Sequence, residues 1–175
     1  TDLLSKVTDI PVKEITNGAG VEPDRLYILP SNATATLLDG RLRLGPRMPP
    51  HHPMPIDVFF PSLEREQQQR CIGVVLSGTG TDGTLGLGEI KGVGGVTFAQ
   101  EQGWAKYFGM PGSAIAGGLV DFVLTPEGIA QEIARIAGQS AALDPLDLLR
   151  WPGVVADSSR DVEPLVVAAR EGVNG

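Results

Sequence analysis

The sequence predicts an α/β domain: a doubly wound, three-layer parallel sheet that carries an inserted antiparallel β-hairpin. Three observations lead to this fold class. From Cys71 onward, short apolar runs alternate with segments of helical periodicity, as in successive βα units. Residues 72–76 form an almost uninterrupted apolar run, which is typical of a strand buried on both faces. Before it, Asp39-Gly40 joins two segments of alternating polarity, a strong signal for a β-hairpin.

Short strands are expected in the first part of the chain. A strand at 12–15 is followed by the Asn17-Gly18 turn, and alternating polarity predicts a further strand at 26–29. The two strands of the hairpin are expected at 34–38 and 41–44. This antiparallel unit therefore interrupts a chain that otherwise follows a strand–helix pattern.

A proline-rich loop and a helix precede Cys71. Residues 46–55 hold five prolines together with His51 and His52, which predicts a loop. Residues 56–68 place apolar side chains at helical spacing and predict a helix. The end of another helix is expected at 2–7.

The second part of the chain is expected to consist of regular βα units. Thr125 as N-cap and Pro126 at the first helical position mark the start of the last helix. Periodicity weakens after it, so the chain is divided into an α/β domain at 1–138 and a helical linker or tail at 139–175. The expected elements are a strand at 72–76, a helix at 83–92, a strand at 96–99, a loop and short helix at 104–116, a strand at 119–124 and a helix at 126–137.

Composition narrows the class of protein. The 175 residues are 42% hydrophobic and carry a net charge of −7 without a basic stripe, which argues against a nucleic-acid partner. No apolar run has the length of a membrane span, so we expect no membrane insertion. The single cysteine, Cys71, excludes an internal disulfide and a cysteine-based zinc site, and we expect a cytoplasmic protein without a metal.

A glycine-rich turn directly after the 72–76 strand holds the acidic residue Asp82. Ligands of open α/β sheets bind beyond the carboxyl ends of the strands, so a carboxylate in this turn is well placed for chemistry. Gly78, Gly80 and Gly83 have the spacing of a dinucleotide-binding turn, and Glu101 lies where a ribose-binding acid is expected. The Asp82 carboxylate would, however, compete with a pyrophosphate for the backbone N–H groups of the turn.

Two other interpretations of this turn remain open on the residues alone. In the first, the glycines only permit a tight turn and Asp82 only caps the helix that follows. In the second, Asp82 holds a histidine in the tautomer that a hydrolytic Ser–His–Asp triad needs. Backbone N–H groups of the same turn would then be available to an oxyanion.

Three motifs make the chain resemble one enzyme family. Residues 55–60 (PIDVFF), 76–83 (LSGTGTDG) and 108–115 (FGMPGSAI) are similar, in this order along the chain, to the catalytic domain of the chemotaxis protein-glutamate methylesterases, the CheB family. The resemblance covers about residues 3–136. The sequence of residues 21–32 looks closest to the version of the family that is fused to the chemotaxis methyltransferase. It implies the same doubly wound fold with an inserted hairpin.

The resemblance also implies a function and a site. Members hydrolyse methyl esters of glutamates on chemoreceptor helices, deamidate glutamines there, and use a Ser–His–Asp triad without a cofactor. It implies that Asp82 is the triad aspartate and that the Thr79 backbone N–H belongs to the oxyanion hole. Implied partners are methylated chemoreceptor helices and a fused or partner methyltransferase. The residues implied to line the site are Gly78, Gly80, Phe108, Gly109, Met110 and Pro111, with His52 and Asp57 in the adjoining loop and helix start.

The family's serine and histidine lie upstream of the segment that matches residues 3–6. We therefore expect the chain to lack about the first 40–50 residues of such a domain, the length of two βα units, and to be inactive alone. Neither Ser77 nor Ser113 lies in a nucleophile elbow, and both are expected to be structural. A non-catalytic interaction module of a chemosensory protein and a dinucleotide-binding domain remain as alternatives.

Overall fold

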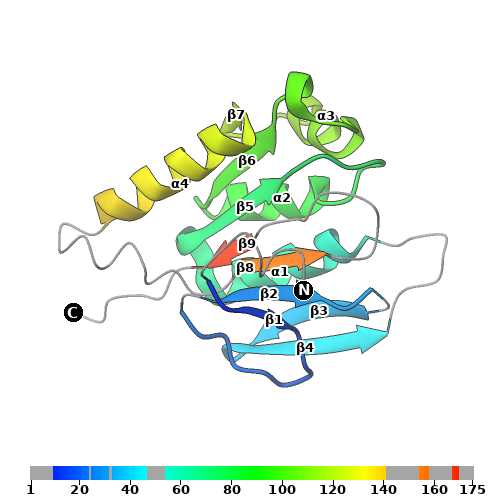
Figure 1. Cartoon of the computed structure of the whole chain (residues 1–175), viewed down its shortest axis with the longest axis vertical. Helices are drawn as coiled ribbons and strands as arrows, with labels where there is room; N and C mark the ends of the chain where they lie inside the picture. Colours follow the sequence, from blue (N-terminus) through cyan, green and yellow to red (C-terminus); the bar gives the residue numbers. More distant parts are fainter. Residues whose placement is uncertain are drawn as a thin grey trace.

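The computed structural model of the chain describes residues 10–23, 25–31, 33–46, 54–140, 154–157 and 167–169. Figure 1 shows a twisted sheet with helices packed against it and a separate hairpin at one end of the molecule. The helix end expected at 2–7 and most of the proline-rich loop, with His51 and His52, lie outside the described residues.

The main sheet has the strand order β1-β2-β8-β9-β5-β6-β7. Its strands pair in parallel except β9, which is antiparallel to both of its neighbours. The parallel sheet predicted from the βα rhythm is therefore confirmed. The strands are β1 (Val12–Glu14), β2 (Leu26–Leu29), β5 (Cys71–Val75), β6 (Val96–Gln100), β7 (Phe122–Leu124), β8 (Val154–Asp157) and β9 (Val167–Ala169).

Helices cover both faces of the sheet around β5, which gives the predicted three layers. Alternate residues of β5 face opposite ways: Val75 belongs to the apolar cluster on the side of α1 and α2, and Val74 to the cluster that α4 covers. Phe98 of β6 joins the second cluster and stacks on Phe122. The helices are α1 (Pro55–Gln67), α2 (Thr84–Gly92), α3 (Gly109–Ala116) and α4 (Pro126–Ser140), with short 3₁₀ helices at Gln68–Arg70 (η2) and Gln102–Trp104 (η3).

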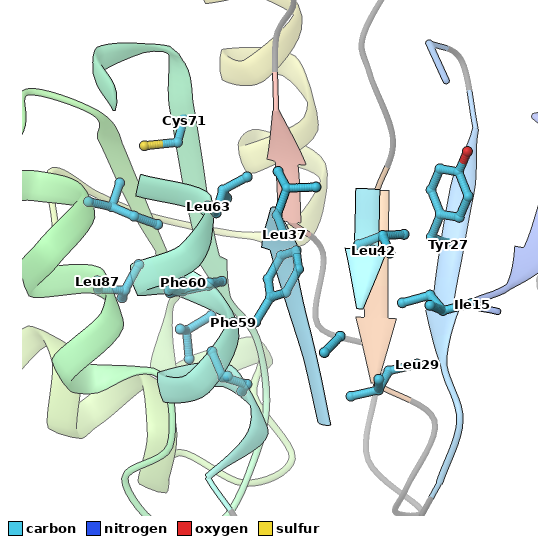
Figure 2. Packing of buried hydrophobic residues seen from close by; sticks show 14 of the residues in the cluster. Ile15, Tyr27, Leu29, Leu37, Leu42, Phe59, Phe60, Leu63, Cys71 and Leu87 are labelled. Atoms are coloured by element: carbon cyan, nitrogen blue, oxygen red, sulfur yellow. The ribbon is translucent and has the colours of Figure 1, made fainter. Parts of the chain in front are cut away.

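The predicted hairpin is present as β3 (Ala33–Leu38) and β4 (Arg41–Pro46), which form a sheet of their own. Asp39 and Gly40 both have positive φ, 51° and 66°, as a two-residue type I′ turn requires. The hairpin packs on α1, where the Leu37 N–H donates to Ser62 Oγ. Figure 2 shows the apolar side chains that continue from α1 toward the hairpin and β2.

Most predicted elements are confirmed with boundaries shifted by a few residues. Thr125 is the expected N-cap of α4, since its Oγ1 accepts the Gly128 N–H. The strand expected at 119–124 is shorter, because the chain bends at Asp121. The helical character expected for 139–175 is wrong at β8 and β9, and the rest of 141–175 lies outside the described residues.

Candidate functional site

Asp82 is buried in the turn that follows the carboxyl end of the central strand β5. Gly83 has φ 87°, a left-handed conformation that strains any residue with a side chain, and it lets the chain turn directly into α2. Asp82 is 9% exposed, whereas Thr79, Gly80 and Thr81 before it are exposed. The structure therefore places one buried carboxylate beneath an exposed stretch of backbone.

The Asp82 carboxylate binds the N-terminus of α1. Its Oδ2 accepts the Ile56 N–H at 3.3 Å and its Oδ1 accepts the Asp57 N–H at 3.0 Å. These N–H groups lie in the first turn of α1 and have no carbonyl partner within that helix. The interpretation that Asp82 only caps the helix after it is wrong, because α2 has Gly83 as N-cap and no side-chain cap hydrogen bond there.

Burial makes Asp82 unusually basic for a carboxylate. The pKa of Asp82 is raised to about 6, chiefly by desolvation and also by the charge of Asp57, while the backbone N–H groups of Asp57 and Ile56 oppose the rise. A perturbed carboxylate at the carboxyl end of a central strand is a frequent mark of a functional site. The Asp82 carboxyl group can thus gain or lose a proton, or make a charge-assisted hydrogen bond, close to neutral pH.

The loop before α3 packs against the glycine turn. The Gly78 N–H donates to the Tyr107 carbonyl and the Met110 N–H donates to the Gly78 carbonyl, both at 2.9 Å. A Cβ at Gly109 would lie 2.9 Å from the Gly80 nitrogen, so only glycine permits this approach. The structure brings together the residues that the sequence assigned to the site: Gly78, Thr79, Gly80, Asp82, Phe108, Gly109 and Met110.

Thr79 and Pro111, which the sequence also assigned to the site, differ in exposure. The Thr79 side chain is exposed, and none of the described residues accepts a hydrogen bond from its backbone N–H. Pro111, by contrast, is buried in α3 and contributes to packing rather than to an exposed lining. Among the described residues, the Thr79 N–H is one of several turn N–H groups without an acceptor, together with those of Gly80, Thr81 and Asp82.

Two polar residues that the sequence did not single out for function hold this loop. Gln100, at the end of β6, is 1% exposed and accepts the Ser77 N–H at 2.7 Å while its Nε2 donates to the Trp104 carbonyl. Ser77 is also buried, and its Oγ accepts the Tyr107 N–H at 2.9 Å. The sequence signal for this contact is a glutamine at the end of a buried strand, because a fully buried side-chain amide needs hydrogen-bond partners.

Both serine hydroxyls make hydrogen bonds within the fold. Ser77 Oγ is bound within the loop contact, and Ser113 Oγ accepts a hydrogen bond from Thr84 Oγ1 at 3.0 Å. Within the described ranges, no group of three or more His, Cys, Asp or Glu side chains could hold a metal ion. No helix in the described part of the chain is long and apolar enough to span a bilayer.

Comparisons with known proteins point to a single family. The sequence profile of the CheB methylesterase family matches residues 1–133. A protein-glutamate methylesterase/protein-glutamine glutaminase of Rhizobium meliloti is 37% identical over 136 residues, and a Pectobacterium atrosepticum protein of the same name is 37% identical over 145 residues. These matches cover 77% and 78% of this chain but 38% and 41% of the relatives.

A longer match and a solved structure agree with these relatives. A 104.1 kDa protein encoded in the hypE 3′ region of Rhodobacter capsulatus is 41% identical over 163 residues, which is 90% of this chain and 17% of that protein. The crystal structure of the Thermotoga maritima CheB methylesterase catalytic domain superposes with a TM-score of 0.71 at 28% identity. That superposition covers 77% of this chain and 74% of the Thermotoga chain.

Proposed function

The chain belongs to the CheB methylesterase family, and from this we propose that it supplies the aspartate of a triad that hydrolyses glutamate methyl esters on chemoreceptors. The observation that carries the proposal is the buried Asp82 carboxylate at the carboxyl end of β5, in a turn whose Thr79 N–H, like those of Gly80 and Thr81, has no acceptor among the described residues. Deamidation of receptor glutamines belongs to the same proposal, because both reactions pass through an acyl intermediate.

Each group has a defined role in the proposed reaction. A serine hydroxyl attacks the ester carbonyl and gives its proton to a histidine, which passes it to the departing methanol. Water then cleaves the acyl-serine, and a free glutamate remains on the receptor. Asp82 accepts the Nδ1–H of that histidine, and the Thr79 N–H donates to the carbonyl oxygen as it becomes negative.

Asp82 keeps capacity for this task although it already binds α1. Each carboxylate oxygen has two lone pairs and accepts one backbone N–H from α1. A protonated histidine beside it would also lower its pKa from about 6, since an opposite charge favours the ionised form. Asp82 would then be an anion while the histidine carries the proton.

We propose that the nucleophile and the base come from outside residues 10–140. Ser77 is buried and Ser113 is bound to Thr84, so neither hydroxyl faces Asp82 with a base beside it. The further proposals are a cytoplasmic setting and methylated chemoreceptor helices as substrate, with a fused or partner methyltransferase nearby.

The 175-residue chain alone is expected to release no methanol from methylated chemoreceptor, because a triad without its nucleophile loses nearly all acyl transfer. Methanol release is measured beside the Pectobacterium relative as positive control. Release by the chain would place the nucleophile within it. The Ser113→Ala and His52→Gln variants would then identify the groups responsible.

One observation favours a different class of function. Leu85 is 70% exposed and Trp104 63% exposed, close in sequence to Asp82 and Tyr107 respectively. Contiguous apolar patches mark docking surfaces, and a non-catalytic interaction module would use exposed apolar side chains of this kind. That alternative requires no role for the Asp82 charge, and a neutral side chain at this position would leave partner binding intact.

A further inference from the structure

We propose that Asp57 is a positioning residue for Asp82, and that the two aspartates form a reciprocal lock between the N-termini of α1 and α2. The inference rests on the proposed function, in which Asp82 must hold one orientation. It concerns a residue that the sequence placed only near the site.

The lock consists of two hydrogen bonds that run in opposite directions between the two helix ends. The Asp57 backbone N–H donates to Asp82 Oδ1 at 3.0 Å, so the carboxylate that precedes α2 binds the start of α1. The Gly86 N–H donates to Asp57 Oδ1 at 2.8 Å, so a carboxylate of α1 binds the start of α2. Each helix thus provides backbone donors for the carboxylate that belongs to the other, where negative charge is most favourable.

Close packing leaves the two helix ends little room to shift. A Cβ at Gly86 would lie 2.5 Å from the Phe60 Cβ, so α1 and α2 approach each other as only glycine allows. Figure 2 shows Phe60 of α1 next to Leu87 of α2 in the core beneath this contact. The helix ends that make these two hydrogen bonds are therefore closely packed. The Asp57 N–H, which binds Oδ1, orients the Asp82 carboxylate.

Asp57 also sets the charge that Asp82 experiences. Its Oδ2 is buried and has no hydrogen-bond partner among the residues that the structure describes, although its Oδ1 is bound. Burial raises the Asp57 pKa against the effect of the backbone N–H groups of Gly86, Gly83 and Leu85. Among the described residues, Asp57 is the charged group that acts on the Asp82 pKa.

The test measures the Asp82 pKa in the 175-residue chain by carboxyl ¹³C NMR. Asp57→Asn keeps an oxygen for the Gly86 N–H and removes the charge, so the Asp82 pKa is expected to fall by about half a unit. Glu66→Gln is the matched control. Glu66 is also an α1 carboxylate that accepts two backbone N–H groups, those of Asp39 and Gly40, but at the far end of the helix.

A second variant separates the hydrogen bond from the charge. Asp57→Ala removes the acceptor, and hydrogen exchange of the Gly86 N–H is expected to accelerate about tenfold, whereas Asp57→Asn should leave it near the wild-type rate. If Asp57→Ala does not fold, the Asp57→Asn titration decides alone. An Asp82 pKa in Asp57→Asn equal to that in Glu66→Gln overturns the inference.

The effect of Asp57 on catalysis is measured with the full-length gene product. Asp57→Asn is expected to shift the acidic limb of the pH dependence of methanol release downward, and Glu66→Gln is expected to leave it in place. An unmoved limb overturns the effect of the Asp57 charge on Asp82, whereas the positioning role is decided by the Gly86 exchange rate in Asp57→Ala. Undiminished turnover by an Asp82→Asn protein would instead overturn the proposed function, and the titration of the isolated chain distinguishes these two failures.

Discussion

Asp82→Asn is expected to lower methanol release from methylated chemoreceptor by about 10⁴-fold in the full-length gene product. An amide in place of the carboxylate can donate to the histidine instead of accepting from it, which favours the wrong tautomer. It also withdraws the negative charge that stabilises the imidazolium formed when serine loses its proton. The rate constant is measured at saturating substrate, since the loss should appear in kcat rather than in receptor binding.

Asp121→Asn is the matched control for this experiment. Asp121 also accepts a backbone N–H, that of Thr97, and it pairs with Lys91 away from the glycine turn. Its amide variant should keep turnover close to that of the wild-type protein. Near-normal turnover by Asp82→Asn would contradict the triad assignment and favour the interaction module.

The same substitution is expected to raise the stability of the isolated chain relative to wild type by about 2 kcal/mol as the pH increases from 4 to above 6. Burial raises the folded-state pKa of Asp82 to about 6, above its value of about 4 in the unfolded chain. Between these two values the folded chain binds the additional proton, so the contribution of Asp82 to stability falls as pH rises through this window. Above it the folded protein carries an ionised, desolvated carboxylate, and a neutral asparagine avoids that cost.

Urea unfolding of both chains from pH 4 to pH 8 measures this effect. The difference between variant and wild type reports Asp82 together with its coupling to Asp57, because Asp121 and the exposed Glu22 and Glu132, whose pKa values are lowered, contribute equally to both chains. The variant's advantage should grow from pH 4 to pH 6 and then stay constant. An advantage that shrinks with rising pH would show that the folded state lowers the Asp82 pKa. A stabilising substitution that removes activity would be typical of a functional site.

Local patterns were sufficient to predict most of the fold. The apolar run at β5, the Asp39-Gly40 turn and the Thr125-Pro126 cap each depend on neighbouring residues, and each is confirmed. The strands β8 and β9 follow no such local rule. They pair with β2 and β5, which lie far away in sequence, so the weak periodicity of 139–175 does not reveal them.

The candidate site was predictable in its members but not in its contacts. The glycine spacing and the downstream motif identified the turn and the loop that packs on it. Asp82 was expected at the start of the helix after it, yet its carboxylate binds backbone groups of Ile56 and Asp57, 26 and 25 positions earlier in the sequence. Such a contact depends on how α1 packs against α2, which no local pattern encodes. The partner of Asp57 at Gly86 escaped prediction for the same reason.

The most direct test of the account is the state of the histidine that Asp82 is proposed to hold. In the full-length gene product, ¹H–¹⁵N NMR should detect one histidine whose Nδ1–H proton resonates far downfield, as expected for a hydrogen bond to a buried carboxylate. This resonance should persist in a variant that carries His51→Gln and His52→Gln together, and it should be lost in Asp82→Asn. A downfield resonance that survives Asp82→Asn would show that another group orients the histidine, and the central claim would be wrong.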